Sequence, residues 1–357
     1  MRLFHCQVCD NVLYFENRSC AQCGSRVAYD PEANIMSALE PAEDGSWRSL
    51  HAPRTIRRIC ANAEYDACNW LIPLDCDEQF CLACRHNAII PDLSVGKSLV
   101  EWREQEFAKH RLFYSLLRWE LPLKTRTEDP DHGLAFRFLA DPPSSTGLKV
   151  MTGHDSGLIT IALAEADDAE REKRRVAMDE PYRTLLGHFR HETGHHYWDL
   201  LVRDSEWLDI FRSIFGDERL DYNISLQTHY ADAPPQNWQE THVSAYAASH
   251  PWEDFAETWA HYLHIVDTLE MGTAFGLQVA PLDNRQPELS ANLDFDPYKT
   301  KDFCRILDAW FPFVFAMNSV NRAMGRADLY PFVLSAHIIN KLEFVHSLIR
   351  QRRPVSS

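Results

Sequence analysis

The sequence lacks any run of about 18 consecutive apolar residues, the length that a helix needs to cross a bilayer. Its opening, MRLFHCQVCD, also lacks the apolar core of a secretory signal, because Cys6 and Cys9 stand where that core would lie. We therefore expect a protein without a membrane span that stays in the cytoplasm.

Basic residues are scarce as well. The 357 residues include 36 lysines and arginines against 52 aspartates and glutamates, which gives a formal net charge of −16. An acidic chain repels phosphate backbones, and this argues against nucleic acid as a partner. By contrast, the 45% hydrophobic content can fill a sizeable core, so the composition predicts a globular protein.

Cysteine is almost absent after residue 84, where only Cys304 remains, whereas nine of the ten cysteines precede that point. Cysteines in a cytoplasmic protein bind metal more often than they form disulfides. Pro91 and Gly96 interrupt regular structure at the end of the cysteine-rich part. We predict a zinc ribbon at 1–30, a second zinc-binding module with a linker at 31–95, and a larger domain at 96–357.

The larger domain has the pattern of a mostly helical α+β fold with a small sheet. Residues 216–245 contain Pro234 and Pro235 and show little periodicity, which is typical of a functional loop. Strands are expected at 134–140 and 157–163, the second as a possible sheet edge for an extended peptide. Apolar periodicity predicts helices at 98–119, 182–203, 205–215, 252–270, 300–324 and 330–350.

The first cysteine group has the spacing of a closed zinc site. Two Cys-x2-Cys pairs stand ten residues apart, and each can form a tight turn that directs two thiolates at one ion. Gly24 favours the second turn. Four thiolates suit tetrahedral zinc, with iron as the alternative, and leave no position for catalysis. The predicted ligands are Cys6, Cys9, Cys20 and Cys23.

The second cysteine group is less regular. Cys81 and Cys84 form one more Cys-x2-Cys pair, which predicts a second structural zinc ion. The spacing does not decide which residues complete this site. The candidates for the remaining two ligands are Cys60, Cys68 and Cys76, with His86 as a further one.

The stretch HETGHHYWD, residues 191–199, has the arrangement of a hydrolytic zinc site. His191 and His195 are four residues apart, so on a helix they share a face and can hold one ion, while Glu192 can reach a water molecule. His196 points about 100° away from that face. Asp199 lies on the same face as His191 and His195. We expect its carboxylate to accept a hydrogen bond from a histidine N–H, and direct binding to the metal is the alternative.

A catalytic zinc needs a third protein ligand, and the segment 244–265 offers one. Pro251 is well placed to begin a helix, which puts Glu253 and Glu257 one turn apart on one face. Burial of an acid among aromatic residues is costly unless a cation compensates for it. A crossing of this helix with the histidine helix would form a His2Glu site from His191, His195 and Glu253.

Taken together, these motifs resemble zinc-binding metallopeptidases that carry an N-terminal zinc ribbon, within the gluzincin class. The resemblance covers nearly the whole chain and implies a zincin-like metallopeptidase domain at 96–357. It also implies that Cys60, Cys68, Cys81 and Cys84 bind the second structural zinc, with Cys76 the spare cysteine. The resemblance is carried by the cysteine pairs at 6–23, CNWLIP and CRHNAIIPDLS within 68–94, EPYRTLLGHFRHETGHHYWD at 180–199 and HPWEDFAETWAHYLH at 250–264.

The resemblance implies roles for further residues of the catalytic centre. It makes Glu253 the third metal ligand, and Glu257 an acid that contacts a ligand side chain and not the metal. It also matches Tyr246, seven residues before Glu253, to a tyrosine that donates its hydroxyl to the oxyanion. The expected reaction is peptide hydrolysis by a zinc-activated water, with Glu192 as general base. We thus expect three zinc ions, one catalytic and two structural, and a peptide or protein substrate.

Two alternatives from other classes remain. The chain could be an inactive scaffold that recruits a protein partner through its zinc ribbons, or a hydrolase of a non-peptide amide. Glu192 favours an active site over a scaffold, because a purely structural metal has no use for a general base.

Overall fold

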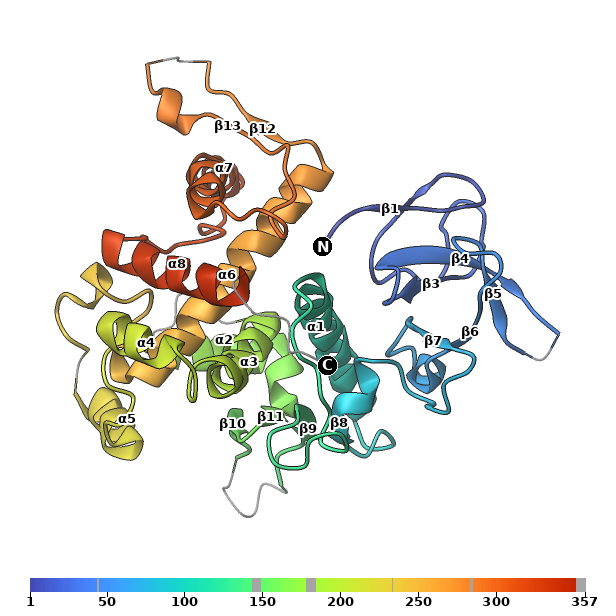
Figure 1. The fold of residues 1–357 in the computed structure, drawn as a ribbon, viewed down its shortest axis with the longest axis horizontal. Coiled ribbons are helices and arrows are strands. Elements are labelled where there is room, and N and C mark those ends of the chain that lie inside the picture. The colour runs from blue at the N-terminus through green and yellow to red at the C-terminus, as the bar shows by residue number, and fades with distance from the viewer. Residues whose placement is uncertain (44, 143–148, 178–183, 233, 283–284, 351–357) are drawn as a thin grey trace. The chain divides into compact units, whose positions relative to one another are not determined.

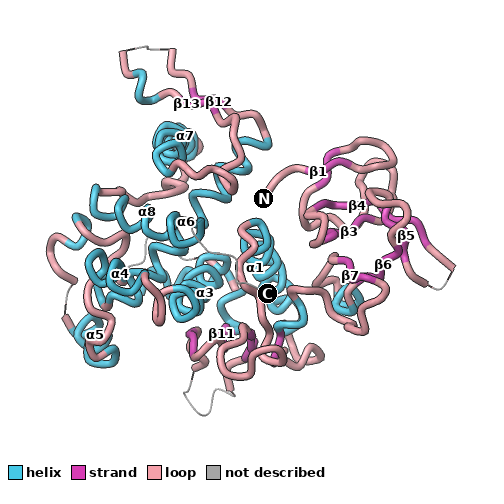
Figure 2. The backbone as a smooth tube through the Cα atoms, in the orientation of Figure 1, coloured by secondary structure: helices cyan, strands magenta, loops and turns pink. Residues whose placement is uncertain are grey.

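The computed structural model describes residues 1–43, 45–142, 149–177, 184–232, 234–282 and 285–350 (Figure 1). The chain divides into two compact units, Met1–Arg171 and Glu172–Ser357. Helix α2 (Asp168–Ala177) spans the division between them. Sheets characterise the first unit and helices the second, so the chain is an α+β protein (Figure 2).

The described residues of the first unit form three sheets. Strands β1 and β2 pair with each other, and β3 to β7 form an antiparallel sheet in sequence order. The third sheet has the order β10-β11-β9-β8, with parallel pairing of β9 to both β11 and β8. The strands are β1 Phe4–His5, β2 Val12–Leu13, β3 Val27–Asp30, β4 Ile35–Pro41, β5 Trp47–Ser49, β6 Ile56–Ile59, β7 Leu71–Pro73, β8 Asn87–Ile89, β9 Ala135–Leu139, β10 Gly153–Asp155 and β11 Leu158–Ala162.

Helix α1 (Ser98–Arg118) joins the sheets of this unit. Its Gln105 amide donates to the carbonyl oxygen of Ala162 at the end of β11, over 2.9 Å. Its buried Tyr114 packs edge-on against Phe15, with ring centroids 5.4 Å apart. Because Phe15 also packs against Tyr29 of β3, α1 forms part of a continuous aromatic core.

In the second unit, most of the regular structure is helical, and loops connect the helices (Figure 2). Its long helix α6 is central, and α3, α4, α7 and α8 all pack against it. A short strand pair, β12 (Gln278–Val279) with β13 (Ala291–Asn292), lies beside α7. The helices are α3 Leu185–Leu201, α4 Trp207–Phe215, α5 Tyr222–Ala231, α6 Pro251–Ala274, α7 Phe303–Ala323 and α8 Ala336–Arg350.

Local signals determine where α3 and α6 begin. The Thr184 hydroxyl precedes α3 and accepts the backbone N–H of Gly187 at 3.0 Å. Pro251 occupies the first turn of α6, as its sequence position predicted, and the His250 ring accepts the N–H of Trp252 at 3.1 Å. These caps fix the first turns of the two helices that carry the predicted ligands.

Close approach of α3 to α6 depends on Gly194. A Cβ atom at this position would lie 2.8 Å from Cα of Ala256 and 3.2 Å from Cβ of Trp259. Gly194 therefore allows the backbone of α3 to touch α6.

We expect Gly194→Ala to destabilise the protein by about 1–3 kcal/mol, because the helices must separate to admit the methyl group. Thermal unfolding followed by circular dichroism measures this effect. Gly153→Ala is the matched control, since a Cβ there meets no atom of the described residues within 4 Å. Equal unfolding midpoints for the two variants would contradict the argument.

The predicted helices and the strands at 134–140 and 157–163 are confirmed, with ends shifted by a few residues except for the last helix, which begins at Ala336 and not at 330. Residues 182–183 of the predicted helix at 182–203 lie outside the described part of the chain. Two expectations were wrong. Residues 216–245 contain helix α5, and β11 lies inside its sheet between β10 and β9, so it offers no edge to a peptide. Among the described residues, no helix combines the length and apolarity that crossing a membrane requires.

Candidate metal centre

Helices α3 and α6 bring three predicted ligands to one point. Nε2 of His191 lies 2.9 Å from Oε2 of Glu253, and Nε2 of His195 lies 3.4 Å from the same oxygen. All three ligand atoms lie within 4.8 Å of one another. Ligands of one tetrahedral zinc ion stand about 3.3 Å apart when each bond is about 2.0–2.1 Å. The three side chains thus have the spacing of a zinc site.

Glu257, one turn after Glu253, fixes the orientation of His191. Its Oε1 lies 2.7 Å from Nδ1 of His191, and its Oε2 accepts the Ser244 hydroxyl at 2.7 Å. Because an ionised carboxylate only accepts, Nδ1 carries a proton, and Nε2 faces a second carboxylate, that of Glu253. Burial lowers the pKa of His191, but these two carboxylates outweigh burial and raise that pKa well above its usual value, so the position at Nε2 favours a positive charge, from a proton or from a metal ion. The donor set therefore fits a cation such as zinc.

The electrostatics of the two carboxylates favour positive charge at this point. Burial raises the pKa of Glu253, but contact with His195 and His191 outweighs burial and holds that pKa well below its usual value. For Glu257 burial also raises the pKa, and the bond from His191 lowers it to about 2. Both carboxyl groups are thus ionised, although Glu253 is only 1% exposed.

Glu192 lies beside the ligands on α3 and is buried. Burial raises its pKa, and the nearby His191 and His195 lower it without cancelling that effect. A carboxylate with a raised pKa is a stronger base, which suits proton transfer near neutral pH.

Two tyrosines lie next to the ligands. The Tyr246 ring centroid is 5.8 Å from that of His191, so the structure brings this predicted residue to the site. Tyr222, at the start of α5, donates its hydroxyl to Oε1 of Glu253 at 2.6 Å. Burial and Glu253 raise the pKa of both tyrosines, which keeps their hydroxyl groups protonated. The sequence gives no signal for Tyr222, because its segment shows little apolar periodicity.

We expect Tyr222→Phe to weaken zinc binding by about 10- to 100-fold, because the bond that orients the Glu253 carboxylate is lost. A competition titration with a chelator measures this affinity. Tyr246→Phe is the comparison: if Tyr246 acts on the reaction alone, its loss reduces turnover and leaves zinc affinity unchanged. Native zinc affinity in Tyr222→Phe would show that the Tyr222–Glu253 bond does not support the site.

Asp199 and His196 also lie on α3. Asp199 forms an ion pair with Arg203, one turn further along the helix. Its predicted support of a histidine N–H stays a prediction. His196 is buried and packs against Tyr197, with ring centroids 5.0 Å apart, and it does not belong to the group of close ligand atoms in the described residues.

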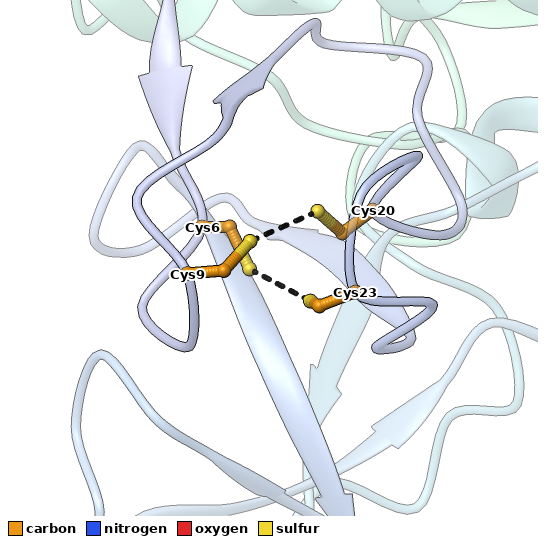
Figure 3. Close-up of side chains that lie close together, drawn as sticks. All are labelled: Cys6, Cys9, Cys20 and Cys23. Carbon is orange, nitrogen blue, oxygen red and sulfur yellow. Dashed lines mark hydrogen bonds between the residues drawn. The ribbon is translucent and has the colours of Figure 1, made fainter.

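The first cysteine group forms a compact cluster in the first unit. Figure 3 shows the pair Cys6 and Cys9 facing the pair Cys20 and Cys23 across a small gap. The sulfur atoms of Cys6 and Cys23 lie 3.7 Å apart, and those of Cys9 and Cys20 lie 3.5 Å apart. Sulfur ligands of one tetrahedral zinc ion stand about 3.8 Å apart. Gly24, with φ of +71°, completes the second turn as expected.

The second cysteine group is buried, with Cys60 directly before the five-residue 3-10 helix Ala61–Tyr65 and Cys68 shortly before strand β7. The structure gathers Cys60, Cys68, Cys81 and Cys84, whose sulfur atoms lie within 4.8 Å of one another. The sulfur atoms of Cys68 and Cys81 are 3.7 Å apart. Cys76 is not part of this cluster; its carbonyl oxygen accepts a bond from Arg58.

Two models of known protein families match the chain. A family model described as "putative zinc-binding metallo-peptidase" matches residues 98–348. A second model, described as a zinc-ribbon domain, matches residues 3–95.

Relatives of the chain occur in Mycobacterium bovis and in two strains of Mycobacterium tuberculosis. Each is 42% identical over 355 residues, which span 99% of this chain and 97% of the relative. All three are named as uncharacterized proteins. No solved structure matches the chain.

Proposed function

Because the chain belongs to the family described as putative zinc-binding metallo-peptidases, we propose that it is a zinc-dependent peptidase with His191, His195 and Glu253 as ligands. The observation that carries this proposal is the convergence of these three side chains from α3 and α6. Three ligands leave one tetrahedral position open, as hydrolysis requires. On this proposal the second unit holds a zincin-like, gluzincin-type site with the HExxH arrangement at 191–195.

Each remaining group has a role in the proposed reaction. Zinc in such a site supplies Lewis acidity, which polarises a carbonyl group and makes water acidic at neutral pH. Glu192 takes the proton from the attacking water and delivers it to the leaving amine. Tyr246 donates its hydroxyl to the oxyanion that develops on the substrate, a contact worth about 3 kcal/mol. Glu257 holds His191 in the tautomer that can bind a metal.

We also propose two structural zinc ions in the cysteine groups, for a total of three ions per chain. Their role is to fix the short strands and turns that carry the cysteines. The predicted domain limits at residues 30 and 95 are part of the proposal and differ from the division into units at Arg171.

The proposed function is tested by a peptide-library cleavage assay on the full-length, zinc-loaded protein. We expect cleavage that disappears on treatment with a chelator and returns on addition of zinc. Products identified by mass spectrometry distinguish internal from terminal cleavage. Absence of any cleaved peptide from a protein with a full catalytic zinc site would count against a peptidase.

The alternative of a scaffold with an inactive site makes a different prediction. A scaffold would bind a protein partner through its zinc ribbons and would turn over no peptide, amide or ester. Glu192 argues against it, since the base is buried beside the ligands where hydrolysis needs it.

A further inference from the structure

His110, in the second half of helix α1, directs its ring at the second cysteine group. Its Nε2 atom lies 3.3 Å from the sulfur of Cys68, 3.6 Å from that of Cys84 and 4.0 Å from that of Cys81. The ring is buried together with these cysteines. The group therefore contains five metal-binding side chains, one more than a tetrahedral ion uses.

A hydrogen bond from the other ring nitrogen of His110, Nδ1, indicates where the ring carries its proton. Nδ1 of His110 lies 2.6 Å from the backbone carbonyl oxygen of Glu106. A carbonyl oxygen only accepts, so Nδ1 carries the proton and Nε2 of the neutral ring carries a lone pair. A lone pair that faces three sulfur atoms is suited to bind a metal.

The distances fit one tetrahedron made of three sulfur atoms and this nitrogen. With zinc bonds of about 2.3 Å to sulfur and about 2.0–2.1 Å to nitrogen, sulfurs stand about 3.8 Å apart, and nitrogen stands about 3.6 Å from each sulfur. The observed sulfur–sulfur distance between Cys68 and Cys81 is 3.7 Å, and the three nitrogen–sulfur distances lie between 3.3 and 4.0 Å. Cys60 is then left over. Its sulfur accepts the backbone N–H of Cys81 at 3.3 Å, as the sulfur atoms of Cys68 and Cys81 also accept backbone N–H groups.

Charge favours the same set of ligands. Oε2 of Glu106 lies 3.5 Å from the sulfur of Cys84, and Glu106 is itself paired with the fully buried Lys109 at 2.7 Å. Zinc with four thiolates carries a charge of −2, whereas zinc with three thiolates and one imidazole carries −1 by formal count. Beside a buried carboxylate, the smaller negative charge is the less costly one to bury.

We propose that His110 is a ligand of the second structural metal, together with Cys68, Cys81 and Cys84, and that Cys60 remains outside. The proposal refines the four-cysteine set expected from the family resemblance. It rests on a metal at this site and is independent of catalysis. Because His110 lies on α1, the metal would join this helix to the cysteine-rich segment.

The test is ¹¹³Cd NMR of the full-length protein loaded with ¹¹³Cd²⁺ alone, since each site gives its own resonance and replacement of sulfur by nitrogen moves it upfield. For the two cysteine groups we expect one resonance typical of four sulfurs and one typical of three sulfurs and a nitrogen. Cys60→Ser should keep both resonances and the native cadmium content. His110→Ala should shift or abolish the second resonance.

Two four-sulfur resonances in the native protein, or loss of the second ion in Cys60→Ser, would overturn the proposal. Cys68→Ser is the control for loss of a ligand and should lose the second ion under either set. If His110→Ala fails to fold, the native spectrum and Cys60→Ser still decide the question. The resonances report ligands and not turnover, so an inactive catalytic site does not affect the outcome.

Discussion

The Glu192→Gln variant should retain zinc, and its peptidase activity should be about 100- to 10,000-fold lower than that of the native protein. Glutamine has nearly the same shape as glutamate but cannot accept the proton of the attacking water, and general-base catalysis typically contributes a factor of this size. The ligands His191 and His195 are unaffected, so the metal content should equal that of the native protein. Initial cleavage rates of a library-derived peptide, measured alongside zinc content, give both quantities.

The control for Glu192→Gln is Glu206→Gln, which neutralises an exposed acid of the same unit outside the site. We expect native activity in this control. Unchanged turnover in Glu192→Gln would remove Glu192 from its role as base, and loss of zinc would show that this side chain supports the ligands instead.

Glu253→Gln should abolish stable zinc binding at the catalytic centre. The substitution removes the negative charge that faces His191 and His195, and it replaces a carboxylate ligand with a weakly binding amide. Loss of a residue that hydrogen-bonds to a zinc ligand weakens zinc binding by about 10- to 100-fold. Loss of the ligand itself should therefore weaken zinc binding by more than about 100-fold. Metal analysis of protein equilibrated with a chelator should find one zinc ion fewer per chain.

The matched comparison is Glu257→Gln, one turn along α6. Its side chain touches His191 without facing His195, so we expect weaker binding by about 10- to 100-fold and full occupancy in excess zinc. Equal zinc affinities for the two variants would contradict the assignment of Glu253 as the ligand.

The parts of the site that follow from helical periodicity were predictable from the sequence. His191 and His195 share a face because they are four residues apart, and Pro251 marks the start of the helix that carries Glu253. Their meeting was a reasonable prediction, because acids and histidines among aromatic residues on a buried helix need a compensating cation.

Tyr222 and His110 could not be predicted in the same way. Helix α5 has no fully buried residue, so no apolar stripe reveals it, and the Tyr222–Glu253 bond joins residues 31 positions apart. His110 is separated from the nearest cysteine, Cys84, by 26 positions, and only the folded α1 places it there. The sheet of β3 to β7 was also missed, because its strands are short and β3 is buried on both faces, without alternation.

The most direct test of the central claim is anomalous X-ray scattering at the zinc absorption edge from crystals of the native protein. The account predicts a zinc peak bonded to Nε2 of His191, Nε2 of His195 and a carboxylate oxygen of Glu253, with the fourth position occupied by solvent. A peak whose four positions are all filled by protein side chains, or no peak between α3 and α6 in zinc-saturated crystals, would contradict it.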